Sequence, residues 1–248
     1  MPLYRDEAVV LRTQKLGEAD RIVTLLTRRN GRVRAVAKGV RRTGSRLGSR
    51  VEPFTHVDLM LHTHAIEAKR GLDTVTQADT IAPFGERIAA DYAAYTAGTA
   101  ILETAERLTV EEREPSIRLF LLLVGALRAL ALGEHPATSV LDAFVLRALA
   151  LSGWEPALQG CARCGRLDGH LWFAPAAGGV LCAEDRQAGA ANLSPGGRLQ
   201  LVALLTGDWA TVDGAAPQVQ REASGMVAAY LQWHLERGLR SLPLVERL

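Results

Sequence analysis

Three cysteines and one aspartate have the spacing of two short metal-binding turns. Cys161 and Cys164 are separated by two residues, and seventeen residues later Cys182 and Asp185 repeat that separation. A zinc ribbon has two Cys-x2-Cys pairs about 15 to 20 residues apart, because each short turn aims two thiolates at one ion. Gly165 suits the tight turn that follows the first pair. The predicted metal ligands are therefore Cys161, Cys164, Cys182 and Asp185.

Structural Zn²⁺ is the ion expected at this set, and Asp185 is its least usual ligand. Carboxylates bind zinc, but closed structural sites favour thiolate and imidazole ligands. Two alternatives stay open. Either His170 or an outside group completes the site, or the knuckle has lost its metal and holds by packing around Trp172 and Phe173. A catalytic zinc would need an open position and a general base, and the sequence identifies neither.

A run of positive charge is the second feature. Between Arg21 and Val51 there are ten Lys or Arg and no Asp or Glu, although the formal net charge of the chain is only +2. A surface of one sign repels itself unless an anion lies against it, and the common polyanion of a cell is nucleic acid. The first-choice contacts are Arg32, Arg34, Lys38, Arg41, Arg42 and Arg46. The supporting contacts are Arg21, Arg28, Arg29 and Arg50.

The patterns that signal catalysis are missing from the sequence. The stretch from Gly39 to Ser45 is the nearest approach to a phosphate loop, but Ser45 stands where that loop needs a lysine. Glu111, Glu112 and Glu114 could suit a two-metal nuclease, yet a solvated helix start explains them more simply. We therefore predict that the chain is not an enzyme.

Scarce aromatic residues narrow the expected mode of nucleic-acid binding. Only Tyr4 and Phe54 are aromatic within residues 1–80. Barrels that read single strands by stacking usually offer several rings, so this chain must rely mainly on phosphate contacts. Weak sequence preference, strong salt dependence and binding of both single and double strands are expected.

Short alternating runs predict five strands in the first 80 residues, at 8–11, 21–27, 32–38, 58–61 and 72–76. Asn30-Gly31 favours a type I′ hairpin turn between the second and third. Five short strands in this length suit an OB-fold barrel. In the third strand, the basic side chains share one face and the apolar ones the other. Gly39–Arg50 is predicted to be a flexible basic loop.

Ala- and Leu-rich periodicity from Ile81 onward predicts helices at 87–108, 115–132 and 139–152, another from Ser194-Pro195, and a last one at 222–237. These helices suit a bundle. The expected fold class is α+β. A five-stranded OB-fold barrel (residues 1–80) precedes a helical domain (81–248), and a zinc-ribbon-like Cys knuckle is inserted at about 158–190.

Charge and composition bound the partners and the compartment. Residues 1–80 carry 15 basic and 9 acidic residues, whereas residues 81–248 carry 14 and 18, so the two parts should have different partners. No uncharged apolar run approaches the roughly 20 residues of a membrane helix. Three cysteines cannot all pair within one chain, which favours a reducing cytoplasm. We expect a cytoplasmic, nucleoid-associated protein without a membrane partner.

Several blocks of the chain resemble the RecO family of bacterial recombination mediators. The most specific are Tyr4–Leu11, Leu16–Thr27 and Gly31–Arg42, and the likeness continues through Tyr92–Gly98, Glu103–Arg107, the cysteine knuckle and Trp233–Glu236. The resemblance implies an N-terminal OB-fold, a helical domain with a zinc knuckle and a role without catalysis. It departs from the family at Asp185, where zinc-binding members carry a fourth Cys.

The resemblance also implies partners. Such proteins bind single- and double-stranded DNA, anneal complementary strands and work with RecR. They help to load the RecA recombinase onto strands covered by single-strand DNA-binding protein (SSB), whose C-terminal tail docks on RecO. Two other hypotheses come from the residues alone: an RNA-binding assembly module, and a metal-dependent nuclease. Tighter binding to structured RNA would favour the first, and strand cleavage with added Mg²⁺ or Mn²⁺ the second.

Overall fold

Strict alternation of burial along β3 (Gly31–Ala37) shows how the N-terminal residues build a closed sheet. Val33, Ala35 and Ala37 are buried, whereas Arg32 and Arg34 between them are half-exposed. Successive side chains of a strand point to opposite faces, so one face can form a core while the other carries charge. The predicted division of β3 into a basic face and an apolar face is confirmed.

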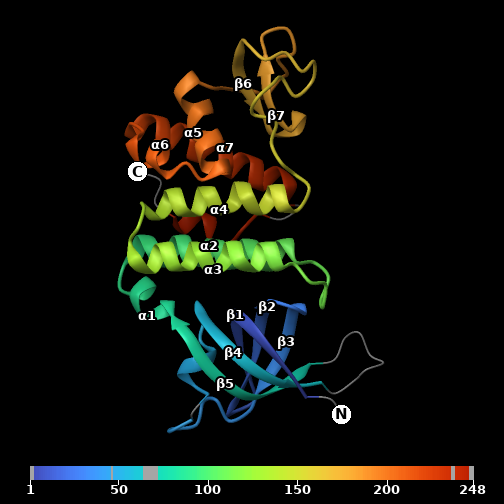
Figure 1. Cartoon of the computed structure of the whole chain (residues 1–248), viewed down its shortest axis with the longest axis vertical. Coiled ribbons are helices and arrows are strands. Elements are labelled where there is room, and N and C mark those ends of the chain that lie inside the picture. Colours follow the sequence, from blue (N-terminus) through green and yellow to red (C-terminus); the bar gives the residue numbers. More distant parts are fainter. Residues whose placement is uncertain (1–2, 46, 64–71, 236–237, 246–248) are drawn as a thin grey trace. The chain divides into compact units, whose positions relative to one another are not determined.

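The computed structural model describes residues 3–45, 47–63, 72–235 and 238–245 (Figure 1). The chain divides into two compact units, Met1–Leu132 and Gly133–Leu248. The first unit holds a β-barrel and three helices, and the second holds a small sheet and four helices among the described residues.

Five strands close the barrel in the order β1-β2-β3-β5-β4. The β3 and β5 strands are parallel, and all other neighbours are antiparallel. This closed five-stranded sheet confirms the predicted OB-like barrel. The strands are mostly longer than predicted, because polar residues continue the pairing beyond the apolar runs: β1 (Leu3–Leu16), β2 (Asp20–Thr27), β3, β4 (Thr55–His62) and β5 (Asp73–Pro83).

The hairpin between β2 and β3 is present, but its predicted turn type is wrong. A type I′ turn needs positive φ at both central residues. Here Gly31 has φ +62° and Asn30 does not share that conformation. A three-residue loop joins the strands instead, and the buried Asp6 carboxylate holds it by accepting from the Asn30 backbone N–H (3.1 Å) and Nδ2 (2.7 Å).

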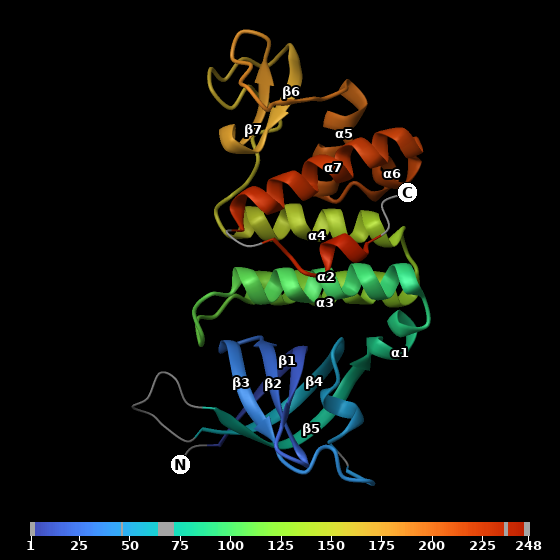
Figure 2. The ribbon, with the colours of Figure 1, turned by 180° about the vertical axis from the view of Figure 1, so that it is seen from behind.

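Helices of the first unit cover the outer face of the barrel on one side. Val9 and Leu26 pair across β1 and β2 and point outward, yet both are fully buried. Phe120 of α3 (Ile117–Leu132) lies on His56 of β4, with ring centroids 5.8 Å apart. Figures 1 and 2 show α2 (Tyr92–Leu108) and α3 running side by side over one end of the barrel.

A cap residue explains why the helix predicted at 87–108 is two helices. Asp91 has extended backbone, and its Oδ1 accepts from the N–H of Ala94 at 2.8 Å, so a new helix begins at Tyr92. The residues before it form the short α1 (Phe84–Ala89).

In the second unit, helices pack on one another beside a small sheet. The predicted start at Ser194-Pro195 is confirmed, because Ser194 Oγ accepts from the N–H of Gly197 at 2.9 Å. The sheet order is β7-β6-β8. The helices are α4 (Ala137–Leu151), α5 (Pro195–Thr206), α6 (Trp209–Gly214) and α7 (Pro217–His234), and the strands are β6 (His170–Ala174), β7 (Gly179–Cys182) and β8 (Ala191–Asn192).

Short 3-10 helices complete the described elements, at η1 (Ser49–Val51), η2 (Pro175–Ala177) and η3 (Leu242–Leu244). The first belongs to the segment that was predicted to be a flexible loop. Its Val51 and the earlier Val40 are buried in the barrel core. Within the described residues, no helix has both the length and the apolar character to cross a membrane.

Two glycines with similar backbone conformation offer a test of how closely the α2–α3 connection approaches β3. An ideal Cβ on Gly31 (φ +62°) would lie 1.9 Å from the carbonyl oxygen of Glu114, whereas one on Gly17 (φ +56°) meets nothing within 4 Å. Both Gly→Ala changes cost about 1 kcal/mol for positive φ. We expect Gly31→Ala to lower the free energy of unfolding by at least about 2 kcal/mol more than Gly17→Ala.

Urea unfolding followed by circular dichroism measures both variants. Equal losses for the two alanines would contradict the close approach of Glu114 to β3.

Candidate nucleic-acid interface and cysteine cluster

The barrel register spreads the predicted basic contacts between its two ends. Arg21 of β2 is the register partner of Lys15 in β1 and of Ala37 in β3. Lys38 follows Ala37, so it lies at the same end of the barrel as Arg21. Arg28 and Arg29 lie in the β2–β3 turn at the opposite end. Figure 2 shows the segment after β3 at the barrel end away from α2 and α3, which we call the open end.

Several of the ten are already paired within the first unit. Arg28 Nη1 lies 2.7 Å from Glu7 Oε2, Arg50 Nη1 lies 3.1 Å from Asp79 Oδ1, and Arg21 pairs with Glu52. Arg41 donates to the backbone carbonyl of Glu18 at 2.9 Å. Exposed pairs of this kind are weak, so these four retain part of their capacity to meet a phosphate.

Arg32 and Arg34 lie beside the α2–α3 connection (residues 109–116), although both stay half-exposed. Arg32 Nη2 donates to the carbonyl oxygen of Val110 at 2.8 Å, and its Nε is buried without a partner among the described residues. Arg34 Nη1 lies 4.0 Å from Glu112 Oε1. The expectation that Glu112 belongs to a solvated helix start was wrong, because its segment forms a β-bridge with Arg32.

Of the ten predicted contacts, three are exposed and uncommitted within the described part of the chain. Lys38, Arg42 and Arg29 make no side-chain hydrogen bond or ion pair with another described residue. Lys38 and Arg42 lie at the open end, and Arg29 lies in the opposite turn. Arg46 falls outside the described residues. The DNA-binding role of all ten basic residues stays a prediction, and the geometry favours Lys38 and Arg42 most.

A buried carboxylate fixes the connection to the barrel. Asp73 Oδ1 lies 2.6 Å from Arg113 Nη2, and its Oδ2 accepts from the Tyr4 hydroxyl at 2.5 Å. The Asp73 side chain is 1% exposed. Burial and the neighbouring Asp73 raise the pKa of Tyr4, which keeps its hydroxyl protonated as a donor. A buried charge needs such partners, so Arg113 holds its segment against the barrel.

The cysteine cluster forms from two turns of the second unit. In the first turn, Gly165 has φ +74° and its N–H donates to the Cys161 carbonyl at 2.9 Å, as its position in the sequence predicted. The second turn follows β7, which ends at Cys182. One ligand atom from each of the four residues lies within 4.8 Å of the others: Cys161, Cys164, Cys182 and Asp185.

The donors of this cluster suit a soft or borderline divalent cation. Asp185 Oδ2 lies 3.3 Å from the sulfurs of both Cys161 and Cys182, and the Cys164 and Cys182 sulfurs are 3.8 Å apart. The adjoining Asp185 carboxylate raises the pKa of the Cys164 thiol to about 12. A divalent cation among the four groups would reverse this effect, because it favours the ionised ligands.

His170, the alternative fourth ligand, is otherwise engaged. Its Nε2 lies 2.7 Å from the carbonyl oxygen of Arg166, and the ring is buried. Phe173 is buried as well and packs edge-on against Tyr230, with ring centroids 5.7 Å apart. Geometry thus favours Asp185 over His170 as the fourth ligand, while packing around Phe173 supports the same knuckle.

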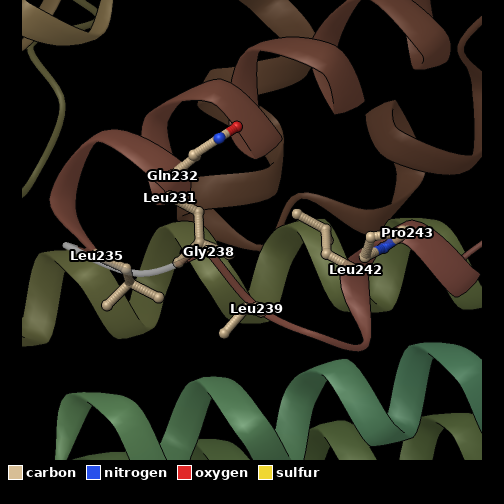
Figure 3. Close-up of a pocket in the computed structure, with 7 residues that line it drawn as sticks. All are labelled: Leu231, Gln232, Leu235, Gly238, Leu239, Leu242 and Pro243. Carbon is tan, nitrogen blue, oxygen red and sulfur yellow. The ribbon is translucent and has the colours of Figure 1, made fainter.

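An apolar pocket in the second unit was missed by the sequence reasoning. Figure 3 shows that its lining comes from the end of α7 and from the segment that follows. The pocket has a volume of about 240 Å³. In the sequence, the pocket is signalled only by the end of the helical pattern at Gly238. The lining residues are Leu231, Gln232, Leu235, Gly238, Leu239, Leu242 and Pro243.

The first unit thus holds a closed five-stranded barrel with exposed cations at one end, and the second holds helices and a cysteine cluster. Residues 1–84 match the family described as Recombination protein O N terminal, and residues 89–243 match Recombination protein O C terminal.

Curated relatives agree along the whole chain. The chain is 60% identical to DNA repair protein RecO of Nocardioides sp. over 99% of its own length and all of that relative. It is 61% identical to DNA repair protein RecO of Frankia casuarinae and 58% identical to that of Streptomyces coelicolor, with both chains fully covered in each comparison. The chain belongs to the RecO family of DNA repair and recombination proteins, which are non-catalytic mediators.

We expect buried His56 to make the stability of the first unit depend on pH. Burial lowers the pKa of His56, despite the hydrogen bond of its Nε2 to Glu7 Oε1 at 2.7 Å. A lowered histidine pKa means that protonation favours the unfolded chain. The free energy of unfolding should therefore fall as the pH drops below the unfolded value of about 6.5.

Urea unfolding of the native chain and of His56→Gln at pH 7.5 and pH 5.5 tests this dependence. We expect the native chain to lose stability between these values and the variant to lose less. Equal losses in both proteins would contradict a role of His56.

Proposed function

We propose that this RecO-family chain binds single- and double-stranded DNA through its barrel and anneals complementary strands. The observation that carries the proposal is the pair of exposed, uncommitted cations at the open end, Lys38 and Arg42, beside the only partly committed Arg41. Annealing needs no acid, base or nucleophile. It needs the phosphate charge of two strands to be neutralised so that they can approach.

Phosphate contacts carry no sequence information, so the interface should accept DNA of any sequence.

The cations of the open end lie next to folded parts of the barrel. Half-exposed Ile22 and Val36 lie opposite each other on the outer face of β2 and β3 and offer apolar surface next to Lys38. Arg41 is held near the β1–β2 turn because its backbone N–H donates to the Ala19 carbonyl at 2.9 Å. The cations of the open end are thus attached to folded backbone.

The proposed cellular role follows from the family. Working with RecR, the chain helps to load RecA onto single strands covered by SSB, whose C-terminal tail docks on it. The relatives are named DNA repair protein RecO, which supports a role in DNA repair. We place the DNA-binding domain at residues 1–80 and the helical domain at residues 81–248, and we place the protein in the cytoplasm with the nucleoid.

A structural Zn²⁺ held by Cys161, Cys164, Cys182 and Asp185 completes the proposal. The converging ligand atoms support it. The ion would tie the two turns of the knuckle together, and it would have no part in annealing.

Charge reversal at the open end tests DNA binding. We expect Lys38→Glu/Arg42→Glu to weaken binding of single and double strands by about tenfold or more and to lower the slope of log affinity against log salt by roughly 2, because two phosphate contacts are lost. Fluorescence anisotropy with labelled oligonucleotides measures both quantities.

Arg87→Glu/Arg118→Glu is the matched control, since it changes the net charge equally at exposed sites on α1 and α3. Similar losses in both double variants would contradict a local interface. Tighter binding of structured RNA than of DNA at matched salt would favour the RNA-binding hypothesis instead.

Replacing the fourth ligand tests the zinc proposal. The native chain should carry one zinc by native mass spectrometry, and Cys182→Ser should lose it. Asp185→Cys should bind zinc at least about tenfold more tightly in competition with a chelator, because thiolate is the softer ligand. Asp168→Cys adds a thiol at an exposed site of the same knuckle and should leave zinc affinity unchanged. Zinc in Asp185→Cys but not in the native chain would support a knuckle held by packing alone.

A further inference from the structure

We propose that Glu112 in the α2–α3 connection competes with DNA phosphates for Arg34 and so limits how tightly the barrel holds DNA. The proposal rests on the DNA-binding function proposed above. It concerns the outer face of β3, where the sequence placed the basic side chains of this strand.

The connection approaches β3 through one isolated β-bridge. Glu112 forms a parallel β-bridge with Arg32, and the backbone N–H of Arg113 donates to the Arg32 carbonyl at 2.9 Å. Gly31 permits the approach, because any side chain there would collide with the Glu114 backbone. Figure 2 shows the connection descending from α2 and α3 to the edge of the barrel at β3.

Two glutamates, one from α2 and one from the α2–α3 connection, lie beside arginines that are aligned across neighbouring strands of the barrel. Arg12, Thr24 and Arg34 are register partners across β1, β2 and β3. Arg12 Nη2 lies 2.8 Å from Glu106 Oε1 of α2, and Arg34 Nη1 lies 4.0 Å from Glu112 Oε1. Each arginine of this outer row therefore has a glutamate of the same unit beside it, where a phosphate would otherwise bind.

The contact at Arg34 can be exchanged without moving the connection. The connection is anchored by the buried pair of Arg113 with Asp73 and by the backbone hydrogen bond of Arg113 to Arg32 of β3. In contrast, the Arg34 side chain is 41% exposed, Glu112 is 27% exposed, and their 4.0 Å separation is too long for a hydrogen bond. A weak, solvated ion pair of this kind can be replaced by a phosphate while the backbone stays in place.

Competition of this kind suits a protein that must release strands. An anion attached to the protein stays at constant local concentration, so every phosphate that binds Arg34 first has to displace it. Binding weakens at this position without any loss of the cations at the open end. A paired strand can then leave the barrel more readily than it would from an uncovered basic face.

Removing the competing charge tests the proposal on the full chain. We expect Glu112→Gln to bind single-stranded DNA about threefold more tightly. The slope of log affinity against log salt should steepen by roughly 0.7, because one more phosphate is neutralised on a single strand. Glutamine keeps the backbone bridge, and thermal unfolding checks that the variant folds. Glu86→Gln, an equal charge change at an exposed site on α1, should leave both quantities near their native values.

A second substitution identifies the cation involved. Adding Arg34→Gln should cancel the gain from Glu112→Gln, because the two residues act as a pair. A gain that persists without Arg34, or an equal gain in Glu86→Gln, would overturn the proposal. If DNA binding by the native chain depends on Lys38 and Arg42 but Glu112→Gln does not tighten it, only this inference is removed. If the native chain binds no DNA, the proposed function fails first.

Discussion

The need to pair one buried carboxylate organises the first unit. Asp73 begins β5 at the point where β5 joins β3 in parallel, and it is almost fully enclosed. A carboxylate in such a place must find a cation, and Arg113 supplies it from a segment forty positions away. The α2–α3 connection is thereby drawn to the barrel wall. Its backbone then bonds to β3, and the outer arginines of that strand acquire neighbours of opposite charge.

The distribution of positive charge that a partner meets therefore differs from the distribution along the sequence. Ten basic residues follow one another without an acid, yet folding brings Glu7, Glu52, Asp79 and Glu112 to several of them. At the open end, Lys38 and Arg42 keep their charge unopposed within the described structure. Under the proposed function, these two cations are therefore the first-choice contacts of a polyanion, although the richest run of arginines begins elsewhere.

Local patterns in the sequence were sufficient for much of this architecture. Alternation predicted both faces of β3, and the Cys-x2-Cys spacing predicted a cluster that the fold brings within 4.8 Å. Features that depend on distant residues were not predictable. The partner of Arg32 lies 78 positions away, and no period in the sequence reveals it. The break before α2 was missed because Asp91 reads as one more polar helix residue until its capping bond is seen.

The residue after the bridge between β3 and the connection has a consequence for how this surface can vary among relatives. Arg113 has φ +64°, the left-handed conformation of a turn, so Glu112 reaches towards Arg34 while Arg113 reaches towards Asp73. A β-branched residue at position 113 would disfavour this conformation and would also leave Asp73 without its cation. The backbone conformation of the connection, as much as its charge, therefore limits which residues can replace Arg113.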